Sequence, residues 1–97
     1  MRLRYTARAI TDLTEIADYL ASRSPVGAER VRVAILVTLQ TIAHLPHIGR
    51  LQTTNRVRKI AARRYPYLIY YRVDDDAAEV VVLTIQHSAR QRIFRDA

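Results

Sequence analysis

The sequence contains no cysteine and only two glycines, Gly27 and Gly49, which stand alone. The absence of cysteine excludes a disulfide framework, a thiolate zinc site and a cysteine nucleophile. Two isolated glycines cannot form the glycine-rich loop that cradles a phosphate in nucleotide-binding proteins. We therefore expect no cofactor.

Long apolar runs are also missing, since the longest uninterrupted one is the five residues 33–37. A membrane-spanning helix needs about 20 apolar residues, and a secretion signal needs an apolar segment behind a basic start. We therefore expect no membrane span and a cytoplasmic protein. A length of 97 residues suffices for one two-layer core, so we predict a single domain over residues 1–97.

Acidic residues are scarce, with nine Asp and Glu against sixteen Lys and Arg, which gives a formal net charge of +7. Fifteen of the sixteen basic residues are Arg, and the segment 50–64 holds six basic residues and no acid. A positive field of this size favours an anionic partner, either nucleic acid or an acidic protein segment. The alternative explanation is codon bias in a GC-rich genome. Codon bias would account for the preference for Arg over Lys, but less well for the clustering of the basic residues.

A tyrosine-rich stretch, 65–73, is the strongest strand signal in the chain, because four of its nine residues are Tyr. Aromatic and β-branched residues suit a pleated, half-buried surface, and Pro66 is tolerated near the start of a strand. Apolar side chains on both faces predict an interior strand. A second apolar run, 79–87, follows after the short polar turn 74–78, which predicts an antiparallel hairpin.

Two helices with an apolar stripe are predicted in the first half of the chain. Thr6 can cap the first helix, and Ser24 followed by Pro25 can begin the second. The second helix should end near His44, because Pro46 cannot continue it. The first helix should carry an acidic outer face, made by Asp12, Glu15 and Asp18.

Adding a short strand at 2–5 and a weaker one at 56–61 gives the order β-α-α-β-β-β. The predicted fold is therefore α+β, an antiparallel sheet with an N-terminal helical hairpin packed on one face. Simple alternation along the last strand assigns side chains to its two faces. The covered face should hold Val81, Leu83 and Ile85, and the open face Val80, Val82, Thr84 and Gln86.

Two groups of metal-ligand type residues are better explained without a metal. His44 and His47 have a spacing that could hold zinc, but the helix end and Pro46 between them separate their side chains. The carboxylates of residues 74–76 are expected to be solvated at a hairpin tip and to satisfy nearby backbone N–H groups. We therefore predict no metal site.

His87 and Arg90 follow the last strand directly and are the remaining catalytic candidates. Histidine exchanges protons near neutral pH, and an arginine three residues later could neutralise a phosphate. The more common alternative is a hydrogen-bonded structural histidine at the end of a strand.

The chain resembles the ParE/RelE superfamily of small bacterial toxins from type II toxin–antitoxin (plasmid stabilisation) modules, over nearly its whole length. No single motif is specific, but their order and spacing together are. The family's fold has the element order predicted above. The resemblance is carried by Tyr5-Thr6, Asp12-Leu13, Glu15-Ile16, Tyr19-Leu20, Pro25, Ala28, Leu45-Pro46, Gly49-Arg50, Tyr65-Pro66-Tyr67, Tyr71-Arg72-Val73, His87 and Arg90.

The branches of this superfamily differ in activity. The ribosome-dependent, mRNA-cleaving branch typically carries an Arg on the central strand, and basic residues with a Tyr after the last strand. Here Leu68, Ser88 and Phe94 stand at those positions. Cleaving RNA at the 2′-hydroxyl needs a general base, a cation for the phosphate and a leaving-group acid. The chain keeps only His87, Arg90 and Arg92 for these roles.

The resemblance therefore favours the ParE branch, whose members are described as inhibitors of DNA gyrase and not as hydrolases. It implies neutralisation by a cognate ParD-like antitoxin with an acidic C-terminal segment. The alternatives are a RelE-like ribosome-dependent mRNA endoribonuclease using His87 and Arg90, and a plain nucleic-acid-binding module supported by charge alone. Predicted target contacts are Arg90, Arg92 and Arg95, and predicted antitoxin contacts are Arg56, Arg58 and Arg63.

Overall fold

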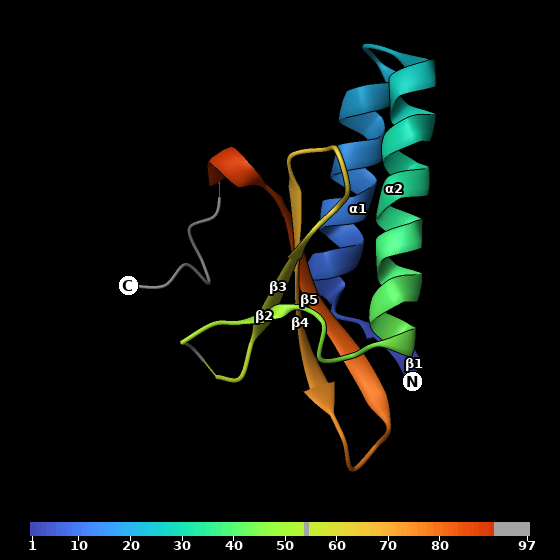
Figure 1. Ribbon diagram of the computed structural model, residues 1–97. Coiled ribbons are helices and arrows are strands. Elements are labelled where there is room, and N and C mark those ends of the chain that lie inside the picture. The colour runs from blue at the N-terminus through green and yellow to red at the C-terminus, as the bar shows by residue number, and fades with distance from the viewer. Residues whose placement is uncertain (54, 91–97) are drawn as a thin grey trace.

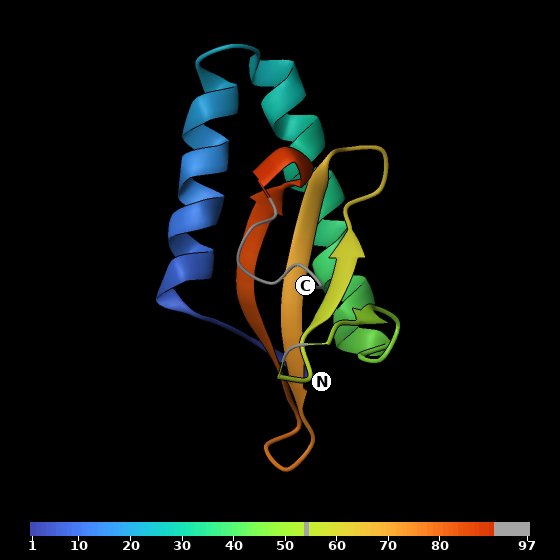
Figure 2. The ribbon, with the colours of Figure 1, turned by 90° about the vertical axis from the view of Figure 1, so that its left-hand side faces the viewer.

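The protein folds into two layers, a helical hairpin on one face of a five-stranded sheet (Figure 1). The structure is a computed structural model, and it describes residues 1–53 and 55–90. When the molecule is turned so that the left-hand side of Figure 1 faces the viewer, the sheet lies in front of α2 and its open face is seen (Figure 2). The elements are β1 (Arg2–Tyr5), α1 (Ala7–Ala21), α2 (Pro25–His44), β2 (Arg50–Leu51), β3 (Arg58–Ala61), β4 (Tyr67–Asp74), β5 (Glu79–His87) and the 3-10 turn η1 (Ser88–Arg90).

Both helices begin where the capping residues predicted. The Thr6 hydroxyl accepts a hydrogen bond from the Ala9 N–H at 3.0 Å, and Ser24 accepts one from the Gly27 N–H at 3.0 Å. Each cap satisfies a backbone donor that the first helical turn leaves unpaired. No helix in the described part of the chain is both long and apolar enough to cross a bilayer.

The strands are arranged in the order β1-β5-β4-β3-β2. The predicted α+β class is confirmed, but the sheet is mixed, because β1 pairs with β5 in parallel. A parallel pair needs a long connection, which the rest of the chain supplies here. The two-residue β2 was not among the predicted strands. Strand β3 begins later than predicted because Asn55 and Arg56 adopt positive φ angles of 47° and 60°, which end any extended backbone there.

A register shift in the central hairpin decides which residues of β5 face the helices. Tyr70 is opposite Thr84 and Tyr71 is opposite Val82, so Leu83 has no partner on β4. Such a bulge changes which alternate residues point to one face of the sheet. Val82 is therefore fully buried in the core while Leu83 is only half-buried.

The predicted faces of β5 were therefore wrong on one side of the bulge. Val80 and Val82 belong to the covered face, and Val81 belongs to the open one. Ile85, beyond the bulge, lies in the core as predicted. Strict alternation cannot show where one extra residue enters a strand.

The core lies between the helices and the covered face of the sheet. Burying one large aliphatic side chain is worth about 1.5–3 kcal/mol, so this layer supplies most of the favourable energy of folding. Its main members are Val31, Ile35, Leu39 and Ile42 of α2, Ile69 and Tyr71 of β4, and Val80, Val82 and Ile85 of β5.

The loop after α2 is fastened to β4 by one tyrosine. The Tyr71 hydroxyl donates to the Pro46 carbonyl at 2.8 Å and accepts from the Gly49 N–H at 2.8 Å. A Cβ atom on Gly49 would lie only 2.5 Å from that hydroxyl. Position 49 therefore requires glycine, because the ring passes directly over the backbone.

Candidate functional site

The sheet face that the helices leave open carries a set of basic side chains. Arg4 of β1 and Arg72 of β4 lie on either side of Val81 of β5, directly opposite it in register. The next row across β2, β3 and β4 is Arg50, Lys59 and Tyr70. We call Arg4, Arg50, Arg56, Lys59 and Arg72 the basic face.

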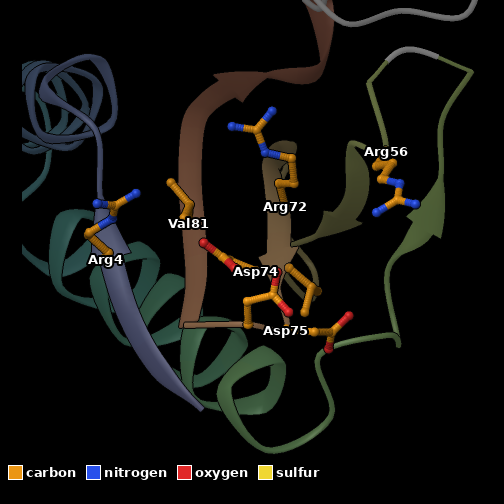
Figure 3. A pocket seen from close by; sticks show the side chains of 8 residues that line it. Arg4, Arg56, Arg72, Asp74, Asp75 and Val81 are labelled. Atoms are coloured by element: carbon orange, nitrogen blue, oxygen red, sulfur yellow. The ribbon is translucent and has the colours of Figure 1, made fainter. Parts of the chain in front are cut away.

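A hollow of about 410 Å³ lies in this face beside the β4–β5 turn. Arg4, Val81 and Arg72 stand side by side on adjacent strands, and Arg56 reaches the hollow from the loop before β3 (Figure 3). Carboxylates of residues 74–76 complete the lining. A hollow lined mostly by charged groups suits a charged surface group of a partner, and not an apolar small molecule.

Part of the positive charge in this region is already compensated. Glu79 lies 2.7 Å from the guanidinium of Arg2 and 3.8 Å from that of Arg4. Among the described residues, Arg56 and Arg72 form no ion pair. These two arginines therefore keep their charge available to an anionic partner.

The three predicted antitoxin contacts do not form one patch. Arg56 opens onto the basic face, while Arg63 is exposed in the turn after β3. Arg58 pairs with Tyr71, on the helix side, where it donates to the His47 carbonyl at 3.1 Å and the Gly49 carbonyl at 2.9 Å. Arg58 thus holds the loop after α2 in place.

His87 lies on the helix side of the sheet, away from the basic face. It is paired with Tyr67, a core residue, and the two rings meet edge to face with centroids 5.5 Å apart. Its Nδ1 accepts a hydrogen bond from the Ala89 N–H at 3.1 Å. Burial raises the pKa of Tyr67, and neighbouring Tyr19 adds to the effect.

Arg92 and Arg95, two of the predicted target contacts, lie outside the described residues, as does Phe94, and the side chain of Arg90 is not among the described ones.

His44, at the end of α2, has its Nδ1 2.9 Å from the Gln40 carbonyl. In the hairpin turn, Asp74 accepts a hydrogen bond from the Ala77 N–H at 3.1 Å, the local role predicted for these carboxylates.

Asp12 is a residue of α1 that the sequence pattern misplaced. Its side chain was predicted to be on the acidic outer face of α1, but it is only 13% exposed. One carboxylate oxygen accepts hydrogen bonds from the Thr84 hydroxyl and from the Ile85 N–H. Strand β1 ends before this part of β5, so Asp12 satisfies polar groups at an otherwise unpaired strand edge. Asp12 lies three residues after Ala9, which is buried. Because residues three apart lie on the same side of a helix, this spacing could have shown that Asp12 turns inward.

Two solved structures of bacterial toxin–antitoxin complexes share this fold. The chromosomal ParDE system of P. aeruginosa matches with a TM-score of 0.75 at 24% identity, covering 90% of this chain and 95% of that one. The E. coli RelBE complex matches with a TM-score of 0.62 at 20% identity, covering 87% of this chain and 92% of that one. The fold is thus that of the small α+β toxins of these systems.

Sequence comparison then gives the family. The family model of the ParE toxin of the type II toxin–antitoxin system parDE matches residues 3–92. Toxin RelE2 of Caulobacter vibrioides is 35% identical over 86 residues, covering 89% of this chain and 93% of its own. The chain belongs to the ParE toxin family of type II toxin–antitoxin systems, which confirms the predicted superfamily.

Proposed function

We propose that this toxin inhibits DNA gyrase and is neutralised by a cognate antitoxin with an acidic segment. The observation that carries the first part is the composition of the open sheet face at the end of β5, on the side opposite to His87. The row of residues there is Ala61, Leu68 and Gln86, which carries no charge. The amide oxygen of Gln86 is buried and has no hydrogen-bond partner in the described part of the chain.

This arrangement supports an inhibitor over a nuclease. Cutting RNA needs a proton acceptor, a phosphate-neutralising cation and a proton donor around one phosphate. Among the described side chains, His87 and the basic face lie on opposite sides of the sheet. The basic face, together with Arg90, Arg92 and Arg95, is better suited to bind an acidic surface of a target protein.

The second candidate function is a RelE-like, ribosome-dependent mRNA endoribonuclease. One observation favours it: a relative with 35% identity is named toxin RelE2, although the matching family model is that of ParE. In this function His87 would be the acid or base, with Tyr67 beside it.

The antitoxin partner is supported by charge. The ParDE and RelBE structures are named for toxin–antitoxin pairs, and this chain carries a net charge of +7. Arg56 and Arg72 on the basic face have no ion-pair partner among the described residues. An acidic segment that folds on binding could supply the missing carboxylates.

Two assays with the purified chain separate the two activities. We expect it to block negative supercoiling of relaxed plasmid by gyrase and to leave translated mRNA uncut in primer extension. Arg72→Ala and Arg90→Ala should each raise the half-inhibitory concentration about tenfold, the size expected for the loss of about 1.4 kcal/mol of binding energy. Arg30→Ala, an exposed arginine on α2, is the matched control and should change nothing.

His87→Ala is the variant that discriminates. It should leave gyrase inhibition unchanged, because His87 lies on the other side of the sheet from the basic face. Codon-positioned mRNA cuts that disappear in His87→Ala would instead assign the endoribonuclease function.

A further inference from the structure

The hollow beside the β4–β5 turn is lined by charges of both signs. Its arginine wall consists of Arg4, Arg56 and Arg72, and its aspartate wall consists of Asp74, Asp75 and Asp76. Val81, which is 6% exposed, lies between Arg4 and Arg72 and forms an apolar floor. Asp74 and Asp75 lie nearer the turn than Arg72 does (Figure 3). The hollow therefore presents positive groups on one side and negative groups on the other.

Most of these charges are not paired with one another. Arg4 is 3.8 Å from Glu79, but within residues 1–53 and 55–90 neither Arg56, Arg72 nor the aspartate wall forms an ion pair. Arg72 and Asp74 share one face of β4, yet alternate residues of a strand are about 6.6 Å apart along the chain. Opposite charges that line one hollow without pairing leave room for a ligand that contacts both.

The two walls decide what kind of ligand can enter the hollow. A simple anion is attracted by the arginine wall and repelled by the three carboxylates, and for a simple cation both effects are reversed. No group of three acidic or histidine side chains among the described residues is placed to hold a metal ion. A ligand with an anionic group at one end and a cationic group at the other is attracted by both walls at once.

The geometry of the arginine wall suits a phosphate group. Arg4 and Arg72 stand on strands that are two apart in the sheet, which places their Cα atoms roughly 9.5 Å from each other across Val81. A phosphate above Val81 can accept hydrogen bonds from both guanidinium groups, whose planar forks match its oxygens. On the other wall, the three N–H donors of an ammonium group match the carboxylate acceptors.

Size and position set this hollow apart from the catalytic candidates. Its volume of about 410 Å³ lies in the range of roughly 300–1,000 Å³ that is typical of small-molecule sites. Along β5, Val81 precedes His87 by six residues, a distance of about 20 Å at 3.3 Å per residue. A ligand in the hollow therefore does not reach His87.

We infer that the hollow binds a small phosphorylated amine, with the phosphate against the arginine wall and the ammonium group against the aspartate wall. This chemistry occurs in free soluble molecules and in the headgroup of a phospholipid. The inference goes beyond the proposed function and does not depend on it.

The experiment compares a phosphorylated amine with its two halves. Amide NMR spectra of the isotope-labelled chain are titrated with O-phosphoethanolamine, inorganic phosphate and ethanolamine at low ionic strength, where exposed charges are least screened. O-phosphoethanolamine should bind about tenfold more tightly than either half. The largest shifts should be those of the Val81 and Arg72 amides.

Two exposed positions give variants with different expected effects. Arg72→Gln should weaken the binding of both O-phosphoethanolamine and inorganic phosphate by about tenfold. Asp75→Asn should weaken the binding of O-phosphoethanolamine but strengthen that of inorganic phosphate, because it removes both an attraction for the amine and a repulsion of the phosphate. The matched controls are Arg30→Gln on α2 and Asp18→Asn on α1, both at exposed positions, and they should bind all three probes like the wild type.

Equal affinity of the wild type for O-phosphoethanolamine and for inorganic phosphate would overturn the inference. So would an Asp75→Asn variant in which both affinities change in the same direction, or amide shifts that leave Val81 and Arg72 unaffected. Co-sedimentation with phosphatidylcholine vesicles, with and without phosphatidylethanolamine, then identifies the source of the ligand. Binding that requires both phosphatidylethanolamine and Arg72 assigns a lipid headgroup, whereas binding of the free probe alone assigns a soluble molecule.

Discussion

The two helices of this protein lie side by side on the same sheet but present different surfaces to solvent. The outer side of α1 is mostly polar and charged, with Arg8, Thr11, Glu15 and Asp18 exposed beside the apolar Ile10 and Tyr19. The outer side of α2 is apolar over several turns, and the segment 33–43 has no charge. A polar outer face suits contact with water, whereas Val33, Leu36 and Val37 leave apolar surface of α2 uncovered in the free chain.

The helices also differ in how they are fastened to the sheet. Asp12 of α1 accepts hydrogen bonds from Thr84 and Ile85 at the edge of β5. Helix α2 instead buries four apolar side chains, and its end is held through Tyr71. Both helices therefore pack apolar side chains on the sheet, and α1 adds a buried polar attachment through Asp12.

The largest predicted change in the free energy of unfolding distinguishes the two sides of α2. Ile42 is fully buried on the inner side, so Ile42→Ala should lower the free energy of unfolding by about 2–5 kcal/mol through lost transfer energy and a cavity. Val37→Ala on the outer side should stay within about 0.5 kcal/mol of the wild type. Urea unfolding followed by circular dichroism measures both. Equal losses would mean that the outer side of α2 is already packed in the free chain.

The next effect tests the sheet surface under the helices. Val82→Ala should cost about 1.5–3 kcal/mol of unfolding free energy, because Val82 is fully buried. Leu83→Ala should cost less, although it removes more atoms, because the bulge leaves Leu83 half-buried. The denaturant midpoints of Val82→Ala and Leu83→Ala show which of the two loses more stability. The opposite order would show that β4 and β5 pair without the bulge.

A loss of similar size is expected from breaking the polar attachment of α1. Asp12→Ala should cost about 1.5–3 kcal/mol, the range for hydrogen bonds to a charged group, because it leaves the Thr84 hydroxyl and the Ile85 N–H unpaired. Glu15→Ala on the exposed side is the control and should stay within about 0.5 kcal/mol of the wild type. Hydrogen exchange of the Ile85 amide should be faster in Asp12→Ala and unchanged in Glu15→Ala. Unchanged protection there would contradict the assigned bond.

The smallest effect should come from the end of α2. Tyr71→Phe keeps the ring in the core but leaves the Pro46 carbonyl and the Gly49 N–H without their partner, a cost of about 1–2 kcal/mol. Tyr19→Phe, at a tyrosine 54% exposed, should be neutral. Thermal unfolding measures both variants.

The same tyrosine makes part of the stability depend on alkaline pH. Burial raises the pKa of Tyr71 above its ordinary value of 10.0, and the Gly49 N–H and Arg58 oppose this. The folded state therefore holds the phenol proton more tightly than the unfolded state. The resulting stability is fully present below the ordinary value and is lost as pH rises above it toward the folded pKa. The difference between wild type and Tyr71→Phe should shrink over that range.

Local chemistry made much of the fold predictable. Thr6, Ser24 and Pro25 mark the helix starts because a cap needs only neighbouring atoms. The β4–β5 hairpin follows from two apolar runs joined by a short polar turn. The bulge at Leu83 could not be predicted, because an extra residue leaves the apolar character of the strand unchanged.

Of the predicted contacts whose side chains the structure describes, only Arg56 belongs to the basic face. Arg56 and Arg58 are two residues apart in sequence, yet one faces an open hollow and the other supports the loop after α2. His87 was identified as a candidate, but its position on the helix side depends on pairing with Tyr67. Sequence spacing does not decide which face a side chain takes beyond a turn or a bulge.

The sequence by itself determined the family, the two capped helices, the central hairpin and the excess of positive charge, because each depends on composition or on contacts between near neighbours. The tertiary structure alone decided the parallel pairing of β1 with β5, the inward turn of Asp12 and the separation of His87 from the basic face. These features join residues up to 77 positions apart. Their physical cause is the need to pair backbone and polar groups across the packed layers, which no local pattern specifies.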